Sequence, residues 1–208
     1  MTKIFFDLDG TLINASNRLY TLFQKLVPQS KFSLEEYWEL KQQKINHQEI
    51  LKKYFPQINY DDFNQTWLKE IETKEMLDLD YLYNDVVSTL EKLKPNHSLF
   101  VLTARQNKEN LLYELNKLKI FKLFDDVFLT EHKKSKDELI QNIPLAPTDM
   151  IVGDTGYDIQ IGQKCGLKTI AITHGFLNES ILQGYAPDYI IYNIKELKIF
   201  AKKELFND

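Results

Sequence analysis

The sequence predicts an α/β fold in which a parallel β-sheet is covered by helices on both faces and a helical segment is inserted after the first strand. From about residue 98 onward, short apolar runs alternate with helical segments, which is the pattern of consecutive strand–helix–strand units. Between residues 15 and 82, by contrast, the apolar residues follow helical spacing. A chain of 208 residues is long enough for one large domain or for one domain with an insertion.

The first predicted strand is followed at once by two acids. The apolar run Ile4-Phe5-Phe6 predicts a buried strand, and Asp7, Asp9, Gly10 and Thr11 come directly after it. Alternate residues of an extended chain point to the same side, so both carboxylates leave the strand end together, and Gly10 permits a sharp turn. Because two such carboxylates repel each other, the strand end is expected to be wet, metal-bound or catalytic.

The insertion is expected to consist of several helices. Leu19, Leu22, Phe23 and Leu26 repeat with the spacing of an amphipathic helix. Ser33, followed three residues later by Glu36, predicts a capping box at the start of a second helix. Further helices are predicted near 34–44, 47–54 and 60–75, with Pro56 between the last two.

The remainder of the chain is predicted to alternate strands and helices. The expected strands are Ser98–Leu102, Val127–Leu129, Met150–Val152, Thr169–Ile172 and Tyr189–Ile191. The expected helices cover 106–118, 136–142 and Tyr157–Cys165, and a last helix starts at about 194.

Chemistry-bearing residues follow four of these strands. They are Asp7 and Asp9, then Thr103, Ala104 and Arg105, then Lys133, Lys134 and Lys136, and finally Gly153, Asp154, Gly156 and Asp158. Ligands of parallel α/β sheets bind outside the carboxyl ends of the strands, so all four groups are expected at one edge.

This set of carboxylates, a hydroxyl and an ammonium suits phosphoryl transfer. Mg²⁺ prefers carboxylate oxygens and water, and it would offset the repulsion between an acid and a phosphate dianion. A lysine and a threonine would hold the phosphoryl oxygens. One carboxylate can then act as nucleophile, and a second can protonate the leaving oxygen and activate water.

The glycines also gather at two places. After Gly10 there is none until Gly153, and five more follow up to Gly184. The clustering suggests two loops that share a task, although a low-glycine background explains it equally well.

At these residues the chain resembles the haloacid dehalogenase superfamily of phosphohydrolases. Asp7-Leu8-Asp9-Gly10-Thr11-Leu12 matches the first motif of that family, Thr103 the second, and Gly153-Asp154-Thr155-Gly156-Tyr157-Asp158 the fourth. The segment from Ala171 to Phe176, followed by Ala186-Pro187-Asp188, is similar to the phosphoglycolate-phosphatase-like branch. The resemblance implies a Rossmann-like three-layer core over residues 1–14 and 83–208, with a small helical cap over 15–82.

The resemblance also implies a role for each matched residue. Asp7 would be the nucleophile and a Mg²⁺ ligand, and Asp9 the general acid/base that offers its backbone carbonyl to the metal. Thr103 and Ala104 would bind phosphate. Asp154 would be the main metal carboxylate, and Asp158 either a metal ligand or a residue that holds one.

The third family motif is a lysine, and here the match is less regular. Many relatives carry Lys-Pro, which is absent from this chain. The stretch Lys136-Asp-Glu-Leu-Ile resembles another family form with the lysine just before a helix, which favours Lys136 over Lys133 and Lys134 for phosphate binding. Asn14 stands where many relatives have an acid, with little effect expected because it lies beyond the turn.

Asp9 narrows the expected reaction. The dehalogenases of the superfamily lack an acid at this position, because a halide leaves without a proton whereas an alkoxide needs one. The sequence therefore favours Mg²⁺-dependent hydrolysis of a small phosphomonoester, and a phosphosugar mutase is an alternative because mutases keep both acids. Two further alternatives are a receiver-like signalling domain and a non-catalytic phosphate-binding module.

The amino-acid composition limits the kinds of binding partner that are expected. The net charge of −4 argues against a broad nucleic-acid surface, and a small phosphorylated metabolite is expected instead. The single cysteine, Cys165, fits a reducing compartment. With neither a membrane span nor a secretory pattern in the sequence, a cytoplasmic monomer or homodimer is expected.

The cap is expected to cover the site and select the substrate. Arg18, Lys41, Lys44 and His47 are candidate contacts, although each is interpreted as a solvated surface group. Trp38, Trp67 and Tyr37 are interpreted as cap core. His174, after a strand, is a further candidate for touching substrate.

Overall fold

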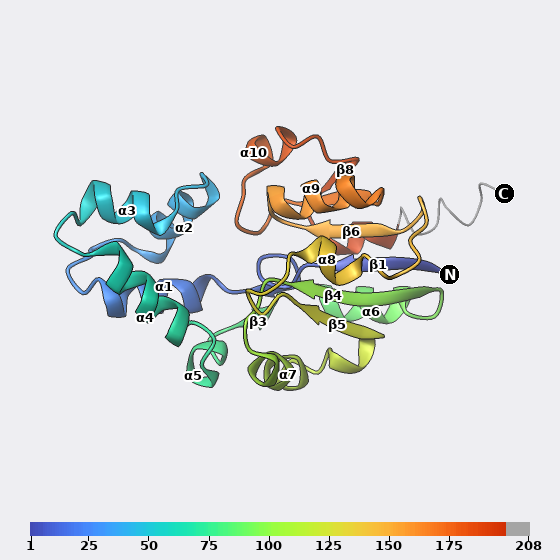
Figure 1. Ribbon diagram of the computed structural model, residues 1–208, viewed down its shortest axis with the longest axis horizontal. Coiled ribbons are helices and arrows are strands. Elements are labelled where there is room, and N and C mark those ends of the chain that lie inside the picture. The colour runs from blue at the N-terminus through green and yellow to red at the C-terminus, as the bar shows by residue number, and fades with distance from the viewer. Residues whose placement is uncertain (199–208) are drawn as a thin grey trace.

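A six-stranded parallel sheet organises the larger part of the computed structural model, which describes residues 1–198 (Figure 1). The strands are β1 (Thr2–Phe6), β4 (His97–Thr103), β5 (Asp126–Leu129), β6 (Met150–Gly153), β7 (Lys168–Ile172) and β8 (Tyr189–Ile191). They lie in the order β5-β4-β1-β6-β7-β8. β1 is central, and Phe5 pairs with Phe100 of β4 on one side and Ile151 of β6 on the other. The predicted parallel α/β fold is confirmed.

Helices cover both faces of this sheet because the side chains of β1 alternate between two apolar layers. Ile4 and Phe6 pack in one cluster with residues of α6 (Val86–Leu93) and α7 (Lys108–Lys117). Phe5 packs on the opposite face, against α8 (Lys136–Ile140) and α9 (Gly156–Cys165). α10 (Glu179–Gln183) and the 3₁₀ turns η1 (Phe121–Leu123) and η2 (Ile194–Glu196) complete this part. The result is a three-layer arrangement.

The cap segment, residues 15–82, is helical and has an apolar core of its own. Its helices are α1 (Ser16–Leu26), α2 (Leu34–Gln42), α3 (His47–Tyr54), α4 (Tyr60–Glu70) and α5 (Lys74–Leu77). Phe23, Tyr37, Leu51 and Trp67 are among the buried residues that pack together there. The chain enters and leaves the segment through β2 (Ile13–Asn14) and β3 (Tyr81–Leu82), which pair antiparallel. We therefore propose that it forms a unit distinct from 1–14 and 83–208.

The local predictions agree with the structure except for a few boundaries, one interrupted helix and four short elements. Ser33 and Glu36 form both hydrogen bonds of the predicted capping box. The helix predicted over 60–75 is interrupted after Glu70, where the Thr73 amide and hydroxyl both donate to the Glu70 carbonyl. The very short β2 and β3, as well as α6 and α10, were not predicted. The last predicted helix starts as η2, and the part from residue 199 lies outside the described residues. None of the described helices has the length and apolar character needed to cross a membrane.

Candidate active site

Asp7 and Asp9 both follow strand β1, but their carboxylates lie in different surroundings. The Asp7 amide donates to Val152 at 2.9 Å and extends the pairing of β1 with β6. Gly10 adopts a φ of +85°, and the turn that follows is closed by amides that donate to the Leu8 carbonyl. The Asp7 carboxylate contacts Lys136, whereas the Asp9 carboxylate contacts Arg105 and Arg18. The acid pair therefore serves two separate clusters.

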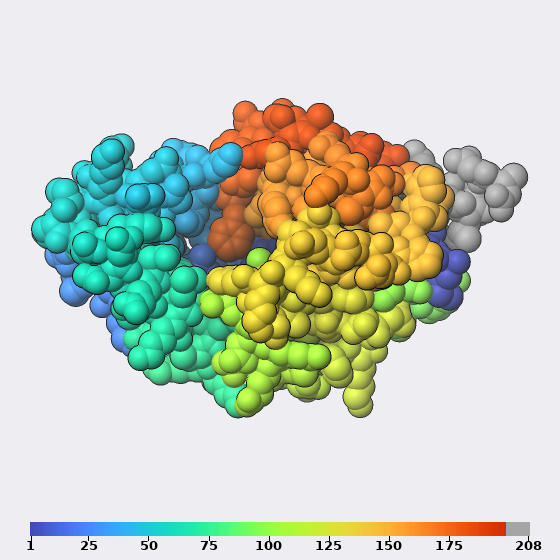
Figure 2. All heavy atoms as spheres, viewed as in Figure 1, coloured from blue at the N-terminus to red at the C-terminus, as the bar shows by residue number. Residues whose placement is uncertain are grey.

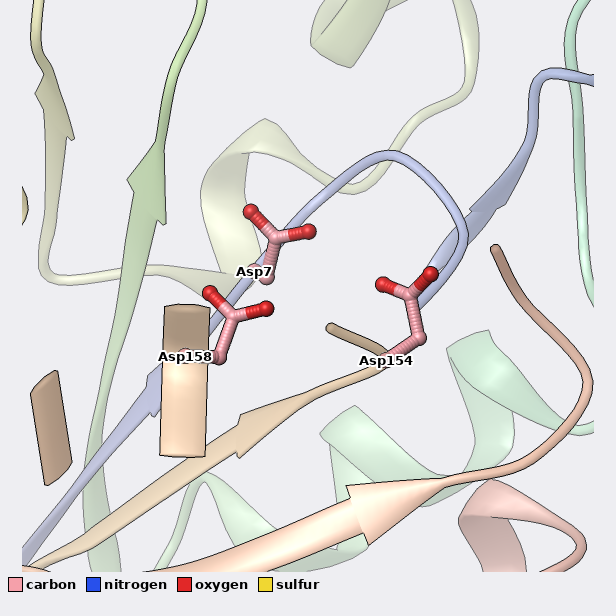
Figure 3. A group of neighbouring side chains, drawn as sticks. All are labelled: Asp7, Asp154 and Asp158. Atoms are coloured by element: carbon pink, nitrogen blue, oxygen red, sulfur yellow. The ribbon is translucent and has the colours of Figure 1, made fainter. Parts of the chain in front are cut away.

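Three carboxylates form the first cluster, which we call the carboxylate cluster (Figure 3). Asp7 follows β1, Asp154 follows β6, and Asp158 lies in the first turn of α9. One oxygen from each lies within 4.8 Å of the other two, and all three residues are buried. Residues 147 and 151 positions apart in sequence are thus brought together because β1 and β6 are neighbouring parallel strands.

Lys136 is the cation of this cluster. Its Nζ lies 2.5 Å from Asp7 Oδ1 and 2.6 Å from Asp158 Oδ1, and the residue is buried. Burial alone would lower the pKa of Lys136, but Asp158 and Asp7 outweigh it and raise this pKa, so the side chain is charged. Lys133 and Lys134, the two alternatives, are exposed.

Asp154 is held in place by two donors and close packing. Thr11 Oγ1 donates to Oδ1 at 2.8 Å, and the Phe176 amide donates to Oδ2 at 2.6 Å. A Cβ at Gly10 or at Gly175 would lie 2.2 Å from Asp154 Oδ2, so neither position has room for a side chain. Gly10 and one member of the later glycine group, Gly175, therefore meet at this carboxylate.

The donor set of the carboxylate cluster fits a divalent cation. Burial raises the pKa of Asp7 to about 7 and that of Asp154 well above its ordinary value, and acid–acid repulsion adds to both. Lys136 alone cannot compensate three buried carboxylates, and hard oxygen ligands are those that Mg²⁺ takes. The Asp9 carboxylate is not part of this cluster; the predicted role of its backbone carbonyl as a ligand stays a prediction.

The second cluster holds Asp9 between two arginines. Arg105 donates Nε to Asp9 Oδ2 at 2.6 Å and Nη2 to Oδ1 at 2.8 Å, and Arg18 donates Nη2 to the same Oδ1. Such a two-pronged pair fixes the plane of the carboxylate. Burial would raise the pKa of Asp9, but Arg105 and Arg18 outweigh it, so this pKa lies below the ordinary value.

Two further acids hold the arginines. Glu114 Oε2 accepts from Arg105 Nη2 at 2.8 Å, and Asp80 Oδ2 lies 3.0 Å from Arg18 Nε. Both acids are buried, and Asp80 lies just before β3, where the chain leaves the cap segment. We call Asp9, Arg18, Asp80, Arg105 and Glu114 the arginine cluster.

Sequence reasoning missed most of the arginine cluster. The interpretation of Arg18 as a solvated surface group is wrong, since it is 2% exposed. A signal was present: Arg18 lies four residues before Leu22, and Glu114 lies three after Leu111 and four before Leu118, so each is on the apolar face of its helix. Nothing in the sequence pattern distinguished Asp80.

Thr103 and Ala104 lie at the carboxyl end of β4, at the same edge as Asp7. Thr103 is buried, and its carbonyl accepts from the Thr130 amide at 3.1 Å. Ala104 is exposed and lines the cavity described next. Their predicted contact with phosphate stays a prediction.

A cavity of about 210 Å³ lies beside Asp9, between the cap segment and the core. Its core side carries polar groups, and its cap side is mainly apolar; the lining includes Asp9, Arg18, Leu19, Trp67, Leu68, Ile71, Ala104, Arg105, Gln106, His132 and Phe176. Figure 2 shows the surface hollowed between the two parts, with N-terminal atoms at the bottom of the hollow. The space suits a small molecule with both polar and apolar groups.

The remaining candidates occupy varied positions. His174 Nε2 lies 3.1 Å from the Thr11 carbonyl, and its ring stacks on Tyr83. Tyr37 and Trp67 belong to the cap core, as predicted. His47 lies between their rings rather than on the surface, and its burial lowers its pKa well below the ordinary value.

The two lysine candidates of the cap segment differ in exposure. Lys41 is half-buried, and burial lowers its pKa to about 8. Lys44 is exposed and donates to the Tyr185 hydroxyl at 2.7 Å.

A buried carboxylate cluster with a lysine, at the carboxyl edge of a parallel sheet, is an arrangement suited to phosphoryl-group chemistry. Residues 4–172 match the family model of haloacid dehalogenase-like hydrolases. The chain belongs to this family.

Several named relatives and solved structures are similar to the chain. The chain is 25% identical to the pyrophosphatase PpaX of Bacillus mycoides over 95% of both chains, and 26% identical to that of Oceanobacillus iheyensis over 93% of this chain and 94% of the relative. The fold is similar to a haloacid dehalogenase-like hydrolase of Streptococcus pneumoniae (TM-score 0.78, 23% identity, 96% of this chain and 98% of the other). It is also similar to a predicted phosphoglycolate phosphatase of Haemophilus somnus (TM-score 0.76, 21% identity, 96% and 97% covered). The protein is an enzyme of the phosphatase type.

Proposed function

We propose that the protein hydrolyses a small phosphomonoester with the help of Mg²⁺, through an aspartyl-phosphate on Asp7. The observation that carries the proposal is the position of Asp7: it is buried beside Asp154, Asp158 and Lys136, at the edge where parallel sheets bind their ligands. A carboxylate next to a lysine and a cation site can approach a phosphate dianion without prohibitive repulsion.

The proposed reaction has two halves. An oxygen of Asp7 attacks phosphorus, and the ester P–O bond breaks. Asp9 gives a proton to the departing alkoxide; because Arg105 and Arg18 lower its pKa, Asp9 takes up this proton from solvent when the substrate binds. In the second half Asp9 takes a proton from water, the water oxygen attacks phosphorus, and the bond to Asp7 breaks. Inorganic phosphate and the original carboxylate result, so atoms and charges balance.

Asp7, Asp154 and Asp158 are the residues that would hold the metal. When bound, Mg²⁺ would withdraw charge from the phosphoryl oxygens and offset the negative charge of the carboxylate cluster. A related fold supports this choice: the hydrolase YfnB of Bacillus subtilis, 19% identical with a TM-score of 0.68 over 96% of this chain and 98% of that one, is described as bound to magnesium.

Lys136, Thr103 and Ala104 are proposed to bind the phosphoryl group. Lys136 contacts Asp7, the proposed nucleophile. Its ammonium is therefore placed to bind a phosphoryl oxygen while the group is transferred from the ester to Asp7. Thr103 and Ala104 end the neighbouring strand β4 and would contribute a hydroxyl and a backbone amide.

A second candidate substrate is inorganic pyrophosphate or another small diphosphate. The relatives named above are pyrophosphatases, and the arginine cluster favours an anionic leaving group. Arg18 and Arg105 line the cavity beside Asp9, and Arg105 Nη1 is buried with no hydrogen-bond partner among the described residues. That donor is available for an oxygen of a leaving phosphate.

The remaining proposals concern context. A cytoplasmic location is proposed, and the single cysteine supports it. A mutase would return an isomer of its substrate, and a receiver-like domain would take up one phosphoryl group without turnover, so product analysis separates both from a phosphatase.

The test is a panel of small phosphomonoesters and pyrophosphate, assayed with Mg²⁺ for release of phosphate. We expect turnover of at least one member and a fall in kcat of at least about 10³-fold in Asp7→Asn, because an amide is not a nucleophile for this step. Circular dichroism would verify that the variant is folded. Wild-type activity in a folded Asp7→Asn variant would overturn the mechanism.

A further inference from the structure

One loop of the core, residues 174–178 between β7 and α10, carries a row of contacts to helix α2 of the cap segment. The Gln42 side chain donates Nε2 to the Gly175 carbonyl at 3.3 Å, and the Asn178 amide donates to the Gln42 carbonyl at 3.1 Å. Gln43 and Leu177 form an antiparallel bridge. We call this segment the α2-docking loop; Figure 1 shows the end of α2 directed toward this part of the core.

The central contact is between two aromatic rings. Trp38 of α2 packs on Phe176, with ring centroids 5.2 Å apart. Phe176 also lines the cavity beside Asp9. Phe176 is therefore in contact both with the cap segment and with the cavity beside Asp9.

The same loop holds the carboxylate cluster from the other side. The Phe176 amide donates to Asp154 Oδ2 at 2.6 Å, so one residue contacts the cap with its ring and the cluster with its backbone. At Gly175, a Cβ would lie 2.2 Å from Asp154 Oδ2 and 2.4 Å from the Gly10 carbonyl oxygen. His174 is tied to the Thr11 carbonyl at 3.1 Å.

Direct contacts therefore run from α2 through the α2-docking loop to Asp154. Interiors packed at this density pass a displacement on to the next group instead of absorbing it. A shift of α2 away from the core removes the contact between Trp38 and Phe176 and the hydrogen bond from Gln42 to Gly175. Because the α2-docking loop also carries the Phe176 amide, such a shift weakens the hydrogen bond from this amide to Asp154 Oδ2.

We propose that Phe176 is a positioning residue that links the seating of α2 on the core to the orientation of Asp154, and thereby to the affinity of the carboxylate cluster for a divalent cation. The inference rests on the proposed function, because it takes Asp154 as a metal ligand. Seating of the cap then tightens metal binding, and by reciprocity metal binding favours the seated cap by the same factor.

The chain offers a matched control elsewhere on the cap segment. Lys74 of α5 forms an ion pair with Glu109 of α7 at 3.2 Å, so it also joins the cap segment to the core. This pair touches neither the α2-docking loop nor the carboxylate cluster. Removing this ion pair shows how the loss of a cap–core contact away from the α2-docking loop changes metal affinity.

The test is calorimetric titration of the purified full-length protein with Mg²⁺, and separately with Mn²⁺, without substrate. We expect Trp38→Ala to weaken metal binding by about 5-fold or more, within the usual range of coupling between sites. Gln42→Ala, a milder change, is expected to weaken it in the same direction. Trp38→Phe, which keeps a ring, and Lys74→Ala should both stay within about 2-fold of wild type.

Thermal unfolding without metal separates positioning from a purely structural role. A structural role lowers the melting temperature of Trp38→Ala and leaves its metal affinity unchanged, and that result would overturn the inference. If Trp38→Ala does not fold, Gln42→Ala decides the question by the same comparison. Absence of metal binding in the wild type would instead refute the proposed metal site, whereas equal binding by wild type, Trp38→Ala and Gln42→Ala would refute only the link through Phe176.

Discussion

The surroundings of Asp7 and Asp9 differ more than a spacing of two residues suggests. Asp7 lies among Lys136, Asp154 and Asp158, all of which come from the core. Asp9 lies between Arg105 of the core and Arg18 of the cap segment, and Arg18 is itself paired with Asp80 near the second cap connection. The proposed nucleophile, Asp7, thus contacts residues of the core, whereas the proposed acid/base, Asp9, contacts residues of both the core and the cap segment.

This difference assigns separate tasks to the two clusters. The carboxylate cluster carries an excess of acid that a divalent cation can offset. The arginine cluster pairs its charges internally and connects α1 with α7 through Asp9. A change in cap position therefore reaches Asp9 directly through Arg18, whereas the α2-docking loop connects it to Asp154 of the carboxylate cluster.

The largest expected effect separates the two acids by leaving group. Asp9→Asn removes the proposed proton donor, so hydrolysis of an alkyl phosphate should fall by about 10²- to 10⁴-fold in kcat. With p-nitrophenyl phosphate, whose leaving group needs no proton, the formation of the phosphorylated enzyme should be far less affected. Rapid-quench measurement of p-nitrophenol release checks this. Equal losses for both substrates would contradict the assignment of Asp9.

The next comparison removes the cation from each cluster. Lys136→Met and Arg105→Met each leave buried carboxylates uncompensated, which costs about 3–5 kcal/mol of unfolding free energy. Mg²⁺ should restore part of the stability of Lys136→Met, because it replaces the lost charge, and none of that of Arg105→Met. Urea unfolding with and without Mg²⁺ measures the difference. Equal rescue of the two variants would show that the clusters are not distinct.

Over one pH unit, the smallest expected effect concerns Asp80. Burial raises the pKa of Asp80 from 3.8 to about 9, so between these values the folded protein holds one more proton than the unfolded chain. The free energy of unfolding then falls as pH rises, by up to about 1.4 kcal/mol per pH unit from this group. Asp80→Asn should flatten that dependence. A slope identical to wild type in urea unfolding at several pH values inside the window would contradict the assignment.

The sequence predicted the carboxylate cluster better than the arginine cluster for a physical reason. Asp7, Asp154 and Lys136 follow strands, and the rule that parallel strands end at one edge brings them together without further information. Arg18 and Glu114 lie within helices, where a charged residue on an apolar face is the single available signal. Which acid each arginine meets depends on how the cap segment sits, and no local pattern encodes that.

The α2-docking loop shows the same limit. The prediction places Trp38 in the cap core. Trp38 does pack against that core, and its ring also packs on Phe176, which lies 138 positions away in sequence. The loop contains one glycine, Gly175, and this position has no space for a side chain beside Asp154. The sequence suggests two loops with a shared task, and the packing shows that Gly10 and Gly175 both lie against Asp154 Oδ2.

The central claim, that Asp7 becomes phosphorylated, can be tested directly in the Asp9→Asn variant. This variant should form the phosphorylated enzyme from p-nitrophenyl phosphate and Mg²⁺ but hydrolyse it slowly, because no base activates water. After an acid quench, mass spectrometry of the peptides is expected to find one phosphoryl group on Asp7, and none in the Asp7→Asn/Asp9→Asn double variant. Release of p-nitrophenol with no phosphoryl group on the protein, or with the group on another residue, would contradict the account.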